Sequence, residues 1–140
     1  MTQTGKDLLL KDLCGRLPYF VKVQIKNEIV VLDSICDDDG YHFNFIGDDR
    51  EGVNIEQVKP YLFPISSMTE EQKNECFKGT PLEIDKYGDI AVKDDLYGGS
   101  QYTDLEIYLK VINWLLKNHF DIYGLIPMGL AIDATNKNIY

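Results

Sequence analysis

The spacing of apolar side chains changes part-way along the chain, and this change restricts the fold more than any other feature. Within residues 19–63 apolar and polar residues alternate, most clearly at Tyr19, Val21, Val23, Ile25, Tyr41, Phe43 and Phe45. A period of two is typical of half-buried β-strands. The run Asp37-Asp38-Asp39-Gly40 predicts a hairpin turn, because Asp and Gly tolerate positive φ. We therefore expect residues 19–63 to form a small antiparallel β-sheet or an SH3-like barrel.

Three other segments have the spacing of amphipathic helices: residues 5–14, 69–78 and 103–118. The second and third begin with predicted capping boxes, at Thr69 and Thr103. The third has the strongest apolar stripe, formed by Leu105, Tyr108, Leu109, Ile112, Leu115 and Leu116. Gly15 and Pro18 are expected to end the first helix. A small sheet packed with three helices is an α+β fold.

Shorter segments give further local predictions. Val53 and Ile55 are expected to start a short strand, whereas Pro60 and Pro64 should carry the residues between them off the sheet. Apolar pairs at 82–84 and 90–92 predict a second hairpin. Ile132 is expected in a last strand, within an apolar tail at 120–133 that should pack against the core.

The length of 140 residues fits one domain, 1–140, with a β-rich part at 19–63 and a helical or mixed part at 64–140. The chain has neither 18 consecutive apolar residues nor a charged-then-apolar leader. The sequence thus predicts no membrane-spanning helix and no signal peptide, and a cytoplasmic protein.

Two short stretches carry more than the whole net charge of −9. Residues 37–56 hold seven acidic residues and one Arg, and residues 83–106 hold seven acidic and two basic residues. Both are rich in Gly and Asp, which is typical of loops. They either keep the domain soluble or form an acidic surface for a basic protein partner. Direct nucleic-acid binding is not expected, because Lys and Arg are not clustered.

Loop tyrosines beside acidic residues are typical of protein-binding surfaces, although ordinary ring packing over a small core is an alternative. The candidate binding residues are Asp37, Asp38, Asp39, Asp48, Asp49, Asp94, Asp95, Tyr97 and Tyr102. A calcium loop is a weaker interpretation of residues 37–40. With Gly40 in sixth position of an EF-hand loop, Ile35 and Ile46 would occupy ligand positions that need oxygen.

No catalytic residue, metal or cofactor is predicted. The histidines have structural interpretations: His42 lies on the polar face of a strand, and His119 lies where a cation stabilises a helix C-terminus. The three cysteines include no CxxC pair. Cys14 and Cys36 are expected to pack as small apolar groups, and Cys76 to be exposed on a charged helix.

Three stretches carry a resemblance: LLLKDLCGRLPY at 8–19, IEQVKPYLFPISSMTEEQ at 55–72 and FDIYGLIPMGLA at 120–131. They are similar to a family of small uncharacterised proteins of Bacteroides-group gut bacteria and of their phages and prophages. The resemblance implies a cytoplasmic accessory protein of phage or prophage origin, and carries no catalytic residues. Its members often have glycine where this chain has Phe20.

These observations favour a non-enzymatic protein-binding or regulatory module whose acidic, tyrosine-bearing loops contact a host or phage protein with a basic surface. A structural or self-associating component is one alternative. A small-ligand binder or enzyme, with a pocket between the sheet and the long helix, is another. The sequence leaves the oligomeric state open.

Overall fold

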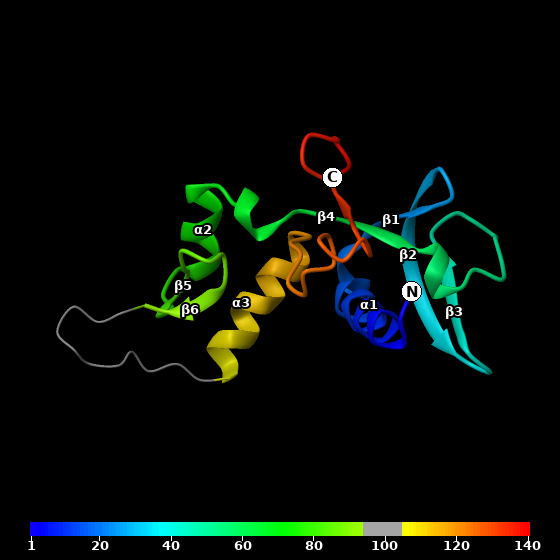
Figure 1. Cartoon of the computed structure of the whole chain (residues 1–140), viewed down its shortest axis with the longest axis horizontal. Helices are drawn as coiled ribbons and strands as arrows, with labels where there is room; N and C mark the ends of the chain where they lie inside the picture. Colours follow the sequence, from blue (N-terminus) through cyan, green and yellow to red (C-terminus); the bar gives the residue numbers. More distant parts are fainter. Residues whose placement is uncertain (94–104) are drawn as a thin grey trace.

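The computed structural model describes residues 1–93 and 105–140 of the chain (Figure 1). The helices are α1 (Gln3–Arg16), α2 (Glu70–Phe77) and α3 (Leu105–Lys117), with 3₁₀ turns at Leu17–Tyr19, Ile55–Gln57 and Ile65–Ser67. The strands are β1 (Lys22–Ile25), β2 (Glu28–Asp37), β3 (Tyr41–Phe45), β4 (Lys59–Leu62), β5 (Leu82–Ile84), β6 (Ile90–Val92) and β7 (Ile132–Asp133). The predicted α+β class is confirmed.

Five strands form one open sheet in the order β3-β2-β1-β4-β7. The first four strands pair antiparallel, and β7 pairs with β4 in parallel. Strands β3 and β7 are the two edges, so the sheet does not close into the barrel that was one of the two predicted forms. Strands β5 and β6 form the separate hairpin predicted at 82–92, and Ile132 lies in the last strand as expected.

Strand β4 corrects the prediction that Pro60 takes the chain off the sheet. Pro60 pairs with Val23 of β1, and the carbonyl of Leu62 accepts a hydrogen bond from the amide of Ala134. Because backbone direction alternates along a strand, the nitrogen of Pro60 faces the same side as Leu62, where β7 starts only at Ile132. No ladder hydrogen bond is lost there, so the strand tolerates proline. The strand expected at Val53 and Ile55 is instead a loop and a 3₁₀ turn.

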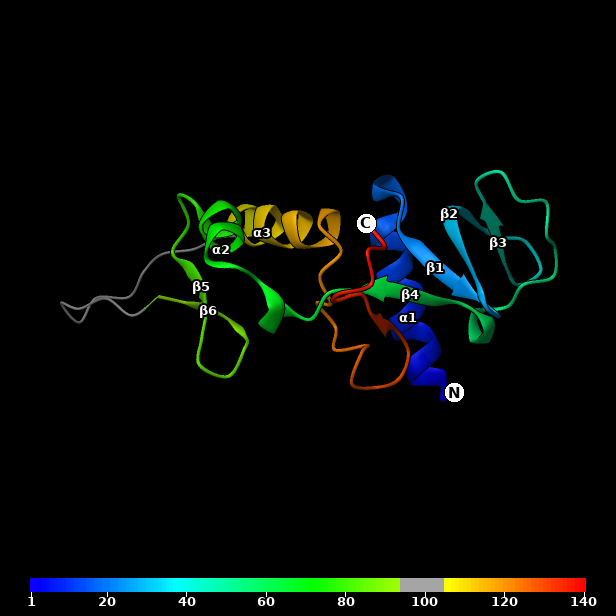
Figure 2. The same cartoon turned by 90° about the horizontal axis from the view of Figure 1, so that it is seen from above.

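The buried side chains form two clusters, which Figures 1 and 2 place toward opposite ends of the long axis. The first cluster lies between α1 and the inner face of the five-stranded sheet and includes Leu9, Leu13, Val23 and Leu32. The second joins α2, α3 and the β5–β6 hairpin, around Phe77 and Leu115. Strand β4 and the packed tail run between them.

Helix α1 is longer than predicted. It begins after Thr2, whose hydroxyl accepts a hydrogen bond from the amide of Gly5, and it continues through Gly15 to Arg16. Gly15 is thus not a helix terminator. A Cβ atom at this position would lie 3.3 Å from Cδ1 of Leu116, so the missing side chain lets α3 approach α1 closely.

Helix α2 follows its prediction closely, whereas α3 follows it only in part. The capping box of Thr69 and Gln72 is formed on both sides, as predicted. In α3, Leu115 and Leu116 are buried, but Leu105 and Leu109 at the other end of the same stripe are 72% and 50% exposed. The predicted capping box at Thr103 lies outside the described residues. Among the described residues, no helix has the length and apolar content needed to cross a bilayer.

The cysteine predictions are reversed. Cys14 and Cys36 are exposed, because each lies on the outer side of its helix or strand. Cys76 is buried in the second cluster, since α2 turns this residue toward α3. Burial raises the pKa of the Cys76 thiol to about 12, which keeps it protonated and a poor nucleophile.

Candidate protein-binding surface

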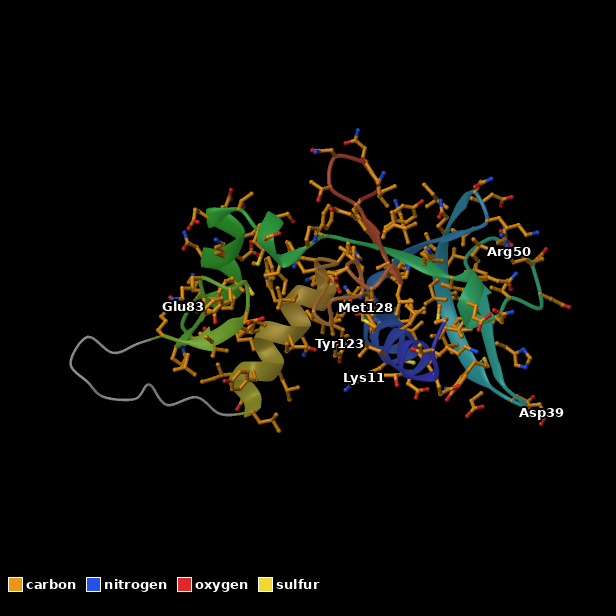
Figure 3. All side chains as sticks on the ribbon, viewed as in Figure 1. Lys11, Asp39, Arg50, Glu83, Tyr123 and Met128 are labelled. Carbon is orange, nitrogen blue, oxygen red and sulfur yellow. The ribbon has the colours of Figure 1, made fainter. Side chains whose placement is uncertain are left out.

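The hairpin between β2 and β3 carries three consecutive carboxylates away from the body of the protein. Asp37 ends β2, and the tip turns through Asp39 at φ 51° and Gly40 at φ 105°. The amide of Asp38 donates to the carbonyl of Gly40 at 3.0 Å, which closes the turn. All four residues are exposed, and Figure 3 shows Asp39 at the extreme end of the hairpin. The predicted hairpin turn is confirmed.

Among the residues that the structure describes, the tip carboxylates form no ion pair. In the described part of the chain, no Lys, Arg or His nitrogen lies within salt-bridge distance of Asp37, Asp38 or Asp39. His42 is the nearest basic side chain by sequence, and its Nε2 is engaged at 2.6 Å with the backbone carbonyl of Asp38 instead. The three negative charges are therefore available to a partner.

The following loop, residues 46–53, is organised by Arg50. Its backbone amide and its Nε each donate to Oδ1 of Asp48 at 2.9 Å, and Nη2 reaches Glu28 at the β1–β2 turn. The hydrogen bonds from Arg50 hold the pKa of Asp48 below its usual range, and the two carboxylates raise the pKa of the guanidinium. Asp48 thus shapes the loop, whereas Asp49 and Glu51 are exposed and form no ion pair with any described residue.

Two shallow hollows flank this loop. One, of about 320 Å³, lies between the loop and the β1–β2 turn, and is bordered by Lys26 and Glu28. The other, of about 350 Å³, lies between the loop and β3, and is bordered by His42 and Asn44. Both share residues 50–53. Figure 3 shows Arg50 and Asp39 at the same end of the molecule. We call the hairpin tip at 37–40 together with the loop 46–53 the acidic end.

The junction of α1 and α3 is occupied by the side chains of Asp12 and Arg16, which are fully buried and paired with each other. His119 lies beside this pair, but its ring is stacked on Tyr140 with centroids 3.7 Å apart.

His119 has a different role from the predicted helix-terminal cation. It occupies the left-handed position after α3 at φ 65°, and the amide of Phe120 donates to the carbonyl of Leu115, as in a Schellman motif. Burial, and then the positive charges of Arg16 and Lys22, lower its pKa to about 4. At neutral pH the ring is therefore uncharged. Its Nδ1 is buried with no hydrogen-bond partner in the described residues.

The predicted site residues divide into three groups. Asp37, Asp38, Asp39 and Asp49 are exposed at the acidic end, and Asp48 lies there as a structural partner of Arg50. The other four candidates, Asp94, Asp95, Tyr97 and Tyr102, lie outside the described residues. Within 1–93 and 105–140, no three His, Cys, Asp or Glu side chains are grouped so that they could hold a metal ion.

Sequence reasoning missed two features of this surface. Arg50 was counted only as one positive charge, although the spacing Asp48-x-Arg50 is a signal for a local turn contact. Glu28 lies 22 residues away from Arg50 in the chain, so nothing local indicates their ion pair.

Comparisons of the chain with protein-family models, with curated proteins and with solved structures found no match. We therefore infer the function from the fold and from the chemistry of the acidic end. The fold is an α+β domain built on an open five-stranded sheet.

Proposed function

We propose that the protein is a non-enzymatic binding module, and that its acidic end captures a protein partner with a basic surface. The observation that carries this proposal is the contrast between neighbouring carboxylates. Asp48 is neutralised by Arg50, whereas the three aspartates of the hairpin tip are exposed and without a cation in the described residues. Within 1–93 and 105–140, the three charges of the tip thus have no ion-pair partner.

A concentrated surface charge favours encounter with a partner of opposite charge and fixes its orientation. Like charges on adjacent residues also repel each other, so a basic partner would relieve a cost that the free protein bears. The two hollows beside the loop supply shape for contact once the partner has arrived. The resemblance to proteins of Bacteroides-group bacteria and their phages leads us to place that partner among host or phage proteins.

The test compares two variants of equal net charge. The triple variant D37N/D38N/D39N removes the tip charges, and D7N/E71Q/E75Q removes three exposed charges outside both acidic stretches. Immobilised protein is exposed to nuclease-treated Bacteroides lysate and eluted with salt. We expect the first variant to lose a salt-released partner and the second to keep it. Equal capture by both variants would show that the tip does not bind.

Self-association is a second candidate function, favoured by the exposed first half of α3. Leu105 and Leu109 leave an apolar stripe in solvent on a helix whose other half is buried. Analytical ultracentrifugation over a range from about 5 to about 200 μM tests it, with Leu109→Glu as the disrupting variant. A dimer that the variant abolishes would support self-association, and a monomer throughout the range would remove it.

A further inference from the structure

Strand β3 is an edge of the sheet, and one side of its backbone has no partner strand in the described residues. The bridge between Phe45 and Asp48 identifies this side, because the amide of Asp48 donates to the Phe45 carbonyl at 3.4 Å. Backbone groups alternate in direction along a strand. The N–H and C=O groups of Tyr41 and Phe43 therefore point away from β2, as those of Phe45 do.

The larger hollow lies along this free side. It is bordered by residues 42–44 of β3 and, across from them, by residues 50–53. Val53 is partly buried against the first cluster, next to the inward-facing Phe43, so the inner side of the hollow is apolar. The edge and the opposite loop together leave a shallow channel with backbone donors and acceptors on one wall.

The loop 46–53 borders the β3 edge, but the strand itself carries none of the residues that block strand addition. Such residues in natural edge strands are Lys, Pro and inward-pointing charges. Strand β3 reads Tyr-His-Phe-Asn-Phe and contains none of these. Its length of five residues is sufficient for a partner strand to form several backbone hydrogen bonds.

We propose that the β3 edge accepts an extended basic segment of the partner protein as an additional strand of the sheet. This inference rests on the proposed function and specifies how the acidic end recognises its partner. The tip carboxylates directly precede β3 and so lie beyond the His42 end of the channel, whereas Glu51 lines it beside Arg50, whose charge is paired with Asp48 and Glu28. A segment with Lys or Arg complements this charge, while its backbone pairs with β3.

The same charges argue against a second copy of this chain as the added strand. A second copy would bring its own three tip aspartates and its own Asp49 and Glu51 toward the acidic end of the first. Like charges placed opposite each other destabilise strand pairing. A basic segment of a different protein would instead be attracted by these carboxylates.

The probe for the test is a capped seven-residue peptide of alternating Lys and Val. Two N-methylated forms are compared with it, one blocking the Val amides and the other blocking the internal Lys amides. In an extended strand these two sets point to opposite edges. We expect one form to bind about tenfold or more weakly and the other to stay within about twofold of the unmethylated peptide. Fluorescence anisotropy measures all three.

Amide hydrogen exchange of the protein gives an independent readout. On saturation with the unmethylated peptide, exchange at Tyr41 and Phe43 should slow about tenfold, because their amides gain acceptors. Binding that depends on the tip aspartates but ignores methylation and leaves these amides unprotected would overturn strand addition while preserving the proposed function. Failure of the peptide to bind at all would overturn the basic-segment inference. Protection that rises with protein concentration alone would instead indicate self-pairing and would also overturn it.

Discussion

Arg16 and Asp12 form a fully buried, two-pronged ion pair one turn apart on α1. Nε of Arg16 lies 2.7 Å from one carboxylate oxygen of Asp12, and Nη2 lies 2.9 Å from the other. The same Nη2 donates to the carbonyl of Phe120 at 2.6 Å, just beyond the end of α3. Because α1 belongs to the first buried cluster and Phe120 to the second, this guanidinium connects the two.

Replacing Arg16 by Met should destabilise the fold by about 3–5 kcal/mol, because Asp12 would keep a buried charge with no partner. Burial already raises the pKa of Asp12, against the lowering effect of Arg16. Urea denaturation at neutral pH measures the change. The double variant D12L/R16M should recover most of the loss, since the lone charge is then gone. A single variant as stable as the wild type would show that the pair contributes little.

Stability should fall as the pH is lowered from 6.5 toward 4, because of His119. In the unfolded chain the imidazole binds a proton near pH 6.5, whereas the folded protein holds its pKa at about 4. Above pH 6.5 the neutral His119 contributes fully to the free energy of unfolding. This contribution is lost at lower pH, because acid protonates the imidazole of the unfolded chain first. We expect this contribution to be about 1–2 kcal/mol, after allowance for the partial exposure of the ring.

The variant His119→Asn tests that origin, because Asn tolerates the left-handed backbone and does not titrate. Urea denaturation at several pH values should give a flatter curve for the variant between pH 6.5 and 4. The pKa of Asp12 is raised in the folded protein, so its protonation stabilises the fold as the pH falls. This effect is the same in the variant and in the wild type. Parallel curves for variant and wild type would exclude His119 as the source.

Phe20→Gly should stabilise the protein by about 0.5–1 kcal/mol, because it relieves backbone strain. Phe20 has φ 55° and ψ 47°, a left-handed conformation that strains any residue with a Cβ, and its ring is 63% exposed. Phe20→Ala is the matched control, since it removes the ring and keeps the strain. Thermal unfolding should give a higher Tm for the glycine variant than for the alanine variant. The reverse order would mean that the left-handed backbone is not strained at this position.

Gly15→Val should destabilise the protein by about 1–3 kcal/mol, by forcing α1 and α3 apart. The side chain added at Gly15 would meet both methyl groups of Leu116, the nearer of which lies 3.3 Å from where a Cβ would stand. Chemical denaturation of G15V, L116A and G15V/L116A gives a double-mutant cycle. Because Leu116 is buried, L116A destabilises the protein by itself, and the loss in the double variant should be smaller than the sum of the two single losses. Additive losses would place the strain within α1 itself.

Features that depend on neighbouring residues were predicted successfully. The hairpin tip at 37–40 and the capping box of Thr69 and Gln72 arise from contacts within four residues of chain. The acidic character of the tip is likewise a local property. In each case the side chain that determines the backbone shape is itself part of the segment.

Predictions that depended on a distant partner were the ones that needed correction. Pro60 breaks an isolated strand pattern, yet it is accommodated in β4 because β7 begins only beyond it. His119 has the position of a helix-terminal cation, but burial and the charges of Arg16 and Lys22, which lie far away in the chain, keep it neutral. The exposure of Leu105 follows from how far α3 extends beyond its contacts.

The sequence by itself determined the α+β class, the hairpins, the acidic tip and most helix positions, because alternation, capping and turn chemistry act over a few residues. Only the tertiary structure decided the parallel pairing of β7, the burial of Arg16 against Phe120 and the free edge of β3. Each of these depends on which surfaces remain uncovered once segments far apart in the chain have packed together, and that outcome is set by burial and backbone pairing over the whole molecule.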